Sequence, residues 1–518
     1  MIDGAHRLAG GRKRGTVAAV PLLRPSGLRR IRSQVVSAAL GVSVSFVLFA
    51  VLGGCASRDP PSQRATTDSL QRVTRADWLE GRGQWPGELW WRELGDARLD
   101  RLIESTLSDS PTLRAAQARV RAADAVERNS SVQASPTLSA GAETADQRLS
   151  RTYLTPAQFA GRRLTTARLA LDFGWEADFW GRNEAQMQAA IGQTRAARAE
   201  QAQARLMLSA AIAQTYVMLV ADQARLRRAA LMLDTRLAQL RVMTRRAEIG
   251  LDSALQREQA SALVDEVRLE HEGLRRNVAI GRNQLVALTG RATLADDELE
   301  VPDTQLAAWA ATVETTPPGR LPLELIARRP DLAAQLARIA SAGSQIRAAE
   351  AEFYPTVNLA AFAGLQSIGL NHLLSRDSLI GYAGPAVRLP ILDGGRLRTQ
   401  LALREADYDA TVEQYNATLL TAVREVSDQL AILSLSREQL RLRERELQSR
   451  RQLEAVAERR RAGGLDSRLL ADERRVQRLV SEQSMIELQA AIASARVGLS
   501  KALGGGYQDP VAAAGGAR

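Results

Sequence analysis

The stretch Pro330-Asp331-Leu332 through Tyr354-Pro355-Thr356 repeats Pro111-Thr112-Leu113 through Ser135-Pro136-Thr137 at a constant offset of 219 residues. Further along, Gly464-Leu465-Asp466-Ser467 repeats Gly250-Leu251-Asp252-Ser253 at an offset of 214. The offset changes between these two anchors, so one copy has a longer loop there. Each unit spans roughly 180 residues, far more than the ~20–50 of a solenoid repeat. The sequence therefore predicts a duplicated domain.

The composition favours helix packing and excludes several functions. Aromatic residues make up only 4% of the 518 residues, and the net charge is +11. Residues 1–54 contribute +7 of that charge (eight Arg or Lys against one Asp), and no basic cluster is interleaved with aromatics, so nucleic-acid binding is not expected.

Residue types that commonly carry chemistry are scarce. One Cys gives no disulfide framework, and His6, His271 and His372 lack metal-ligand spacing. The sequence has no phosphate-binding loop after a strand and no nucleophile elbow. We therefore predict no metal, no cofactor and no enzymatic activity.

The first 55 residues look like an export signal. Arg24, Arg29, Arg30 and Arg32 precede an uncharged run at 35–52, which is followed by Gly53-Gly54-Cys55. A basic region, an apolar region and small residues before a cleavage point are the parts of a secretory signal. A retained transmembrane anchor is the alternative, because 18 residues just suffice to span a membrane. Cys55 after Leu-Gly-Gly resembles a bacterial lipobox, which implies a lipidated Cys55 and, with Ala56 next, sorting to the outer membrane.

Proline placement indicates very long helices. No Pro occurs between Pro156 and Pro302, or between Pro390 and Pro510. Since an interior Pro costs a helix ~3 kcal/mol, such stretches permit long helices. We predict hairpins of two helices, at 183–246 with 252–288 and at 396–461 with 466–503, each turning at a glycine.

Short alternating segments precede each hairpin, at 137–143, 166–173, 356–362 and 386–389. In the second segment one face would carry Ala167, Leu169, Leu171 and Phe173, and the other Arg168, Ala170 and Asp172. Such alternation is typical of membrane β-barrel strands. We take Arg168, Asp172 and Arg388 as candidate lumen-facing residues.

Four membrane strands cannot close a barrel by themselves. The smallest barrels have about eight strands, and an open sheet edge cannot face lipid. Several copies of this chain must therefore contribute strands to one barrel.

The chain resembles the TolC-like family of outer-membrane efflux proteins, in its lipoprotein branch (NodT- and OprM-like). The resemblance covers roughly residues 90–505, and it rests on Trp90-Trp91, Leu94-Gly95-Asp96, Ser110-Pro111-Thr112-Leu113, Leu171-Asp-Phe-Gly-Trp-Glu-Ala-Asp-Phe-Trp-Gly-Arg182, Arg328-Arg329-Pro330-Asp331-Leu332 and Leu389-Pro-Ile-Leu-Asp-Gly-Gly-Arg396. It implies a mainly α fold with a membrane β-barrel, in which a homotrimer forms a 12-stranded barrel and a periplasmic α-barrel. It also implies a passive export duct for small molecules that docks to a periplasmic adaptor and an inner-membrane pump.

The hairpin turns are the candidate periplasmic gate. Relatives close this end with ion pairs and hydrogen bonds, and here the candidates are Arg460, Asp466, Arg468, Asp472 and Asp252. Opposite charges three or four residues apart can pair on a helix. The alternative is that these charges are the solvated ends of long helices.

These observations divide the chain into six predicted parts. They are a signal peptide with lipobox (1–54), an N-terminal lipid-anchored segment (55–105), a first efflux repeat (106–290), a linker (291–329), a second repeat (330–505) and a C-terminal tail (506–518). A periplasmic adaptor or coiled-coil scaffold lipoprotein is the alternative function. It should carry one helical hairpin between β-rich halves instead of two hairpins, each with its own strand pair.

Overall fold

The computed structural model describes residues 85–152, 156–295, 299, 301–302, 304–311 and 328–508. The chain divides into two compact units, Met1–Ser62 and Gln63–Arg518, and every described residue belongs to the second. The predicted signal peptide, Cys55 and His6 lie outside the described residues.

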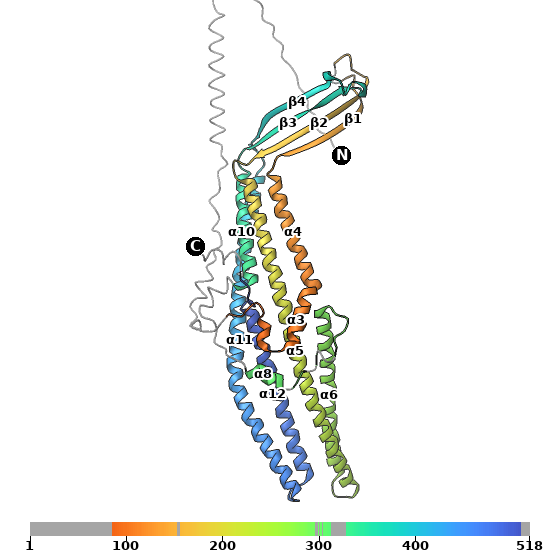
Figure 1. Ribbon diagram of the computed structural model, residues 1–518, viewed down its shortest axis with the longest axis vertical. Coiled ribbons are helices and arrows are strands. Elements are labelled where there is room, and N and C mark those ends of the chain that lie inside the picture. The colour runs from red at the N-terminus through yellow and green to blue at the C-terminus, as the bar shows by residue number, and fades with distance from the viewer. Residues whose placement is uncertain are drawn as a thin grey trace, which may run out of the picture. The chain divides into compact units, whose positions relative to one another are not determined.

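The predicted duplication is present as two matching series of elements (Figure 1). The first repeat consists of α4 (Pro111–Gln133), β1 (Thr137–Arg148), β2 (Arg163–Ala177), α5 (Arg182–Glu248) and α6 (Ala254–Thr289). The second consists of α10 (Pro330–Ala351), β3 (Thr356–Ile368), β4 (Leu379–Arg388), α11 (Arg396–Ala462) and α12 (Arg468–Ala502). Both α5 and α11 have 67 residues, so each is ~100 Å long. The four long helices predicted from the proline gaps are confirmed to within two residues at each end.

The strands form one antiparallel sheet in the order β1-β2-β3-β4. The central pairing of β2 with β3 joins the two repeats and sets Leu169 opposite Leu365. Only the end of β4 was expected at 386–389, because Gly381, Gly384 and Pro385 interrupt the apolar alternation before it. The structure corrects this: β4 begins at Leu379. It is an edge strand, where one side has no neighbour and proline is tolerated.

The helices pack as a layer in which α10 lies between α5 and α11. Small residues allow the close approach of α5 and α10, since a Cβ on Gly192 would lie only 2.8 Å from the Cβ of Ser341. The Ser341 hydroxyl donates to the carbonyl of Ala189 on α5 (2.8 Å). Among the described helices, only α5 contains an 18-residue segment apolar enough to cross a membrane, and 67% of that segment is buried, as in a core helix.

The main core lies midway along α5, where three short elements cover it. These are η1 (Trp90–Leu94), α3 (Ala97–Asp109) and α8 (Thr304–Ala311). The fully buried Tyr216 donates its hydroxyl to Asp96 (3.2 Å), which also caps α3 by accepting the backbone N–H of Arg98 (2.8 Å). Burial and the Asp96 carboxylate raise the pKa of Tyr216, so its phenol stays protonated and keeps donating. This bond fixes the start of α3 on the face of α5.

Candidate functional site: the sheet faces and the hairpin ends

One face of the sheet is uncharged over most of its length. The register places on it, from β1 to β4, Leu138, Ala140, Ala142, Ala167, Leu169, Leu171, Phe173, Trp175, Leu359, Ala361, Ala363, Leu365, Ala383, Pro385 and Val387. Leu169 and Leu171 are 43% and 50% exposed, although large aliphatic side chains in water-soluble sheets are usually covered. This apolar face therefore needs an apolar medium or a partner.

The apolar face has the height of a membrane barrel. Eight residue steps separate Ala167 from Trp175, or about 27 Å along the strand and about 21 Å along the membrane normal at a tilt of about 40°. Membrane barrels have an apolar band about 25 Å tall. Charges on this face begin beyond Ala167, where Asp146 pairs with Arg163 (2.7 Å).

The three lumen-facing candidates share the opposite face. Asp172 lies opposite Phe362, and Arg388 lies opposite Thr356 in the same alternation. Arg168 pairs with Asp172 (3.0 Å), and its guanidinium sits over the Phe362 ring, 5.2 Å from the centroid. The structure thus brings two of the three candidates into direct contact and places all three on one polar face. Whether this face lines a lumen stays a prediction.

Aromatic side chains gather where strands become helices. Trp180 stacks on Tyr354 with centroids 4.7 Å apart, and its indole donates to the carbonyl of Pro355 (2.8 Å). Trp175 donates to the carbonyl of Ala134 (3.3 Å). Trp and Tyr prefer membrane–water interfaces, where the ring is apolar and one atom is polar. Sequence reasoning missed this belt, although the run from Phe173 to Trp180 was its signal.

The two hairpins turn in the same way. In the first turn Arg246 binds Asp252 through two hydrogen bonds (2.6 and 3.1 Å), and in the second Arg460 binds Asp466 likewise (2.7 and 3.0 Å). These pairs are related by the same offset of 214. The pKa of each aspartate is lowered by hydrogen bonding to its arginine. We call Arg246–Asp252 and Arg460–Asp466 the turn pairs.

Other features of the turns explain why the helices end there. Gly250 (φ +73°) and Gly464 (φ +70°) adopt the left-handed conformation that ends a helix. The Ser253 and Ser467 hydroxyls then cap the next helices by accepting the backbone N–H groups of Gln256 and Leu470. The Gly-Leu-Asp-Ser repeat therefore supplies the glycine that ends one helix, the aspartate of the turn pair and the serine that caps the next helix.

The remaining gate candidates lie together on α12. Arg468 faces Asp472 at an i,i+4 spacing, with Nε 3.6 Å from Oδ2, as the spacing predicted. Burial raises the pKa of Asp472, and Arg468 only partly opposes this. Asp466 and Asp252 instead pair within their own turns, so the structure does not join Asp466 to Arg468 or Asp472.

Two clusters were not found by sequence reasoning. Arg329 is buried and donates to Asp331 (2.6 Å), Glu425 (2.9 Å) and the Ala502 carbonyl (2.9 Å), which connects α10, α11 and α12. Burial opposes its charge, but the two carboxylates outweigh burial and raise the pKa of Arg329. The second cluster is a row of ion pairs between α5 and α12: Arg225–Glu487 (2.8 Å), Arg228–Glu482 (2.7 Å) and Arg236–Glu473 (2.7 Å). The Arg-Arg-Pro-Asp-Leu motif, which contains Arg329 and Asp331, was the sequence signal for the first cluster. The ion pairs of the second cluster join residues about 240–260 apart in sequence, so no local pattern indicates them.

The described residues include no group of three His, Cys, Asp or Glu positioned to hold a metal ion. The structure has a sheet with one apolar and one polar face, joined directly to helices about 100 Å long. This combination is typical of channel subunits that enter an outer membrane by strands and extend away from it by helices.

Comparison with known proteins identifies the family within this class. Residues 102–291 and 321–505 match the family described as "Outer membrane efflux protein". The chain is 32% identical over 444 residues to "Multidrug resistance outer membrane protein MdtP" of Escherichia coli, with 82% of this chain and 87% of that protein covered. It is 29% identical over 475 residues to "Probable efflux pump outer membrane protein TtgC" of Pseudomonas putida, covering 89% and 94%. The crystal structure of VceC from Vibrio cholerae matches with a TM-score of 0.71 and 32% identity, covering 82% of this chain and all of that one.

The chain belongs to the outer membrane efflux protein family. It is the outer-membrane channel component of an efflux pump and is not an enzyme, as the sequence predicted. The alternative, an adaptor or scaffold lipoprotein, is excluded by this membership and by the four-stranded sheet that both repeats share.

Proposed function

We propose that this protein is a passive exit duct, formed by a homotrimer, through which a tripartite pump expels small molecules across the periplasm and outer membrane. The observation that carries the proposal is the four-stranded sheet, whose edges β1 and β4 have no partner within the described chain and whose one face is apolar. Three such sheets would give a closed barrel of 12 strands, which leaves no edge in lipid. Light scattering of the detergent-purified protein should give a trimer, and planar bilayers should show one pore per trimer; a monodisperse monomer would contradict it.

The anchor proposal concerns Cys55. Lipidation there would tether the mature N-terminus, while the strands provide the permanent insertion. Labelled fatty acid should enter the wild-type protein, and Cys55→Ser should accumulate as a precursor that keeps residues 1–54. If the wild-type protein takes up no label, the lipobox interpretation is wrong.

The hairpin ends would form the periplasmic gate and meet the adaptor. We expect Asp466→Ala with Asp472→Ala to raise bilayer conductance several-fold, because the pairs of three subunits act together around the axis. The single variants separate two roles: Asp466 shapes the turn through Arg460, whereas Asp472 pairs with Arg468 along α12. If the inserted trimeric double variant conducts like the wild type, the gate lies elsewhere.

The names of the relatives support a proposal about partners and substrates. The similar MdtP is named for multidrug resistance and TtgC for an efflux pump, so we propose a periplasmic adaptor and an inner-membrane pump as partners and drug-like compounds as cargo. A strain that lacks its own outer-membrane channel should regain antibiotic resistance when this protein is expressed with its cognate adaptor and pump. Resistance restored equally well without them would overturn the tripartite assignment.

A further inference from the structure

Two aromatic side chains lie on the polar face of the sheet. Phe362 of β3 is directly opposite Tyr382 of β4, and their rings stack with centroids 5.8 Å apart and an angle of 26° between the ring planes. The Arg168 guanidinium sits over the Phe362 ring on the side away from Tyr382, because β3 runs between β2 and β4. Arg168, Phe362 and Tyr382 thus form a row across three strands, which we call the aromatic row.

Tyr382 is the open end of the aromatic row. Phe362 covers one side of its ring, and the other side points towards the edge of the sheet, so Tyr382 remains 52% exposed. A Cβ on Gly384 would lie only 2.9 Å from the Tyr382 hydroxyl oxygen, so the ring can lean along the strand because that glycine has no side chain. The ring is therefore held in place by its neighbours while one of its faces is left open to a ligand.

Acidic groups outnumber basic ones beside the aromatic row. Glu143 of β1 is exposed and lies directly opposite Arg168, and the Arg168 guanidinium pairs with Asp172 (3.0 Å). Two carboxylates against one guanidinium give this level of the polar face a net charge of −1. A negative charge and the face of an aromatic ring both attract cations. The chemistry therefore favours a ligand that is flat, aromatic and positively charged.

In the proposed duct, the aromatic row lies about halfway up the barrel wall. Phe362 is opposite Asp172, which follows Leu171, and Leu171 is midway between Ala167 and Trp175 on the apolar face. Strands about 4.8 Å apart and tilted by about 40° would give a barrel of 12 strands a diameter of about 24 Å between opposite backbones. Every point in that lumen is within about 12 Å of the wall. Drug-sized cargo would therefore pass close to three copies of the row.

Closing the barrel leaves the outer side of the Tyr382 ring accessible. The strand that comes to lie beside β4 is β1 of the next copy, since β1 and β4 are the two edges of each sheet. The polar face of β1 carries Ser139, Gly141 and Ala145, which are small, and the acidic Glu143. The neighbouring strand thus adds little bulk and a further negative charge.

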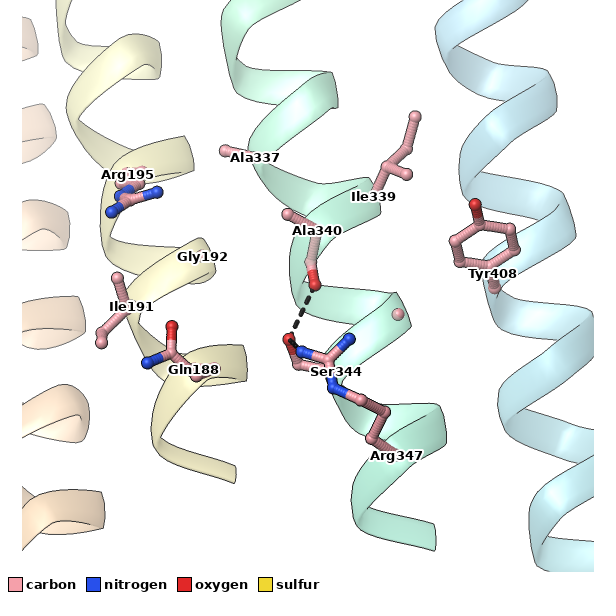
Figure 2. Close-up of a pocket in the computed structure, with 11 residues that line it drawn as sticks. Gln188, Ile191, Gly192, Arg195, Ala337, Ile339, Ala340, Ser344, Arg347 and Tyr408 are labelled. Carbon is pink, nitrogen blue, oxygen red and sulfur yellow. Dashed lines mark hydrogen bonds between the residues drawn. The ribbon is translucent and has the colours of Figure 1, made fainter. Parts of the chain in front are cut away.

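The cavity between α5, α10 and α11 does not have this character (Figure 2). Its volume is about 370 Å³, and the charged side chains among its described lining residues are Arg195 and Arg347, both positive. Figure 2 shows Arg347 directed to Ser344, whose hydroxyl accepts its hydrogen bond (2.9 Å). A cation is therefore disfavoured between these helices and favoured on the polar face of the sheet.

We propose that the aromatic row is a transient stacking site for planar aromatic cations as they leave through the barrel. The open face of Tyr382 stacks on the ligand, and Glu143 and Asp172 supply the negative charge that attracts it. The proposal rests on the proposed function, because only a lumen brings cargo to this face of the sheet.

The test measures the block of single pores in planar bilayers. The blockers are ethidium, a planar aromatic cation, and tetrabutylammonium, a cation without rings. Each is added on the barrel side of the membrane, opposite the helices, so that it meets the aromatic row before the hairpin ends. For the wild type, ethidium should halve the current at a concentration about fivefold or more below that of tetrabutylammonium, because cation–π contacts and stacking require a ring.

Variants of Tyr382 separate the ring from the rest of the pore. Tyr382→Leu should abolish the preference for ethidium, whereas Tyr382→Phe, which keeps the ring, should stay within about twofold of the wild type. The matched control is Tyr354→Leu, the same change at a tyrosine that is 49% exposed but lies at the junction with the helices, stacked on Trp180. Glu143→Gln should weaken ethidium block about twofold or more, because a negative charge is lost.

Equal block of the wild type by the two cations would overturn the proposal without any variant. Ethidium block that Tyr382→Leu leaves unchanged, or that Tyr354→Leu weakens to the same extent, would also overturn it, since either result places the contact elsewhere. A wild-type protein that forms no pore would refute the proposed duct and the stacking site with it. A normal trimeric pore without preference for ethidium would refute the stacking site alone.

Discussion

Replacing Leu171 with Arg tests the assignment of the two sheet faces. Leu171 is the middle apolar-face residue of β2 between Ala167 and Trp175, is 50% exposed, and lies between Ala140 and Ala363 on the neighbouring strands. Its side chain would therefore be near the bilayer midplane. An arginine at that depth on the lipid face of a barrel costs about 2–4 kcal/mol, and the cost falls to about 0–1 kcal/mol near the interfaces.

Two further arginine substitutions make this magnitude diagnostic. Leu359→Arg shares the apolar face but lies beside Trp175, at the end of the band, so we expect about 0–1 kcal/mol. Ser139→Arg lies on the polar face opposite Asp172, where the new charge has a partner, so we expect a change within about 0.5 kcal/mol. Ala170 is not a suitable control, although it shares the polar face, because it is buried against Gly364 of the next strand.

The assay is a urea titration of folding into phospholipid vesicles, with the inserted fraction scored by protease protection. The free energies of unfolding should fall in the order Ser139→Arg, Leu359→Arg, Leu171→Arg, with the last clearly lowest. If Ser139→Arg is as destabilising as Leu171→Arg, the two faces do not meet different media and the membrane assignment of the sheet fails.

Three other predictions concern the helical part. Arg329→Gln should destabilise the fold by about 3–5 kcal/mol because two carboxylates lose a buried cation, and Arg329→Lys should cost less. Denaturant titration measures both variants. A glutamine variant as stable as the wild type would contradict the network. Gly504→Ala should cost about 1–3 kcal/mol, since Gly504 has a φ of +92° and an added Cβ would collide with the Arg328 carbonyl. The matched Gly273→Ala, within α6 and with open space around it, should stabilise by about 0.4–1 kcal/mol in the same titration. The turn pairs should stabilise the hairpin ends above about pH 4, because the pKa values of Asp252 and Asp466 in the folded protein lie below the ordinary 3.8. That contribution is lost as the pH falls through the folded-state pKa values. Hydrogen exchange at the turns that is unchanged between pH 5 and pH 2, after correction for intrinsic rates, would count against this.

Local patterns in the sequence determined most of the architecture. Proline gaps and the glycines at 250 and 464 set the ends of α5 and α11, because a helix depends on backbone bonds between residues four apart. Period-two alternation located β1, β2 and β3, because successive side chains of a strand point to opposite faces of the sheet and one of these faces is apolar. The alternation of apolar and polar side chains could not be recognised over most of β4, because Gly381, Gly384 and Pro385 stand where such side chains would show it.

Interactions between distant residues were decided only by the tertiary structure. The sequence suggested that Asp466 could pair with charges on α12, but the left-handed glycine folds the chain back so that Arg460, six residues earlier, takes both carboxylate oxygens. The Arg329 network and the Arg236–Glu473 pair join helices that are neighbours only after folding. The sequence by itself thus determined the duplicated helices, strands and turns, because these follow from spacing along the chain. The tertiary structure decided which charges pair and where a cavity opens, because those depend on distances between helices that no local spacing specifies.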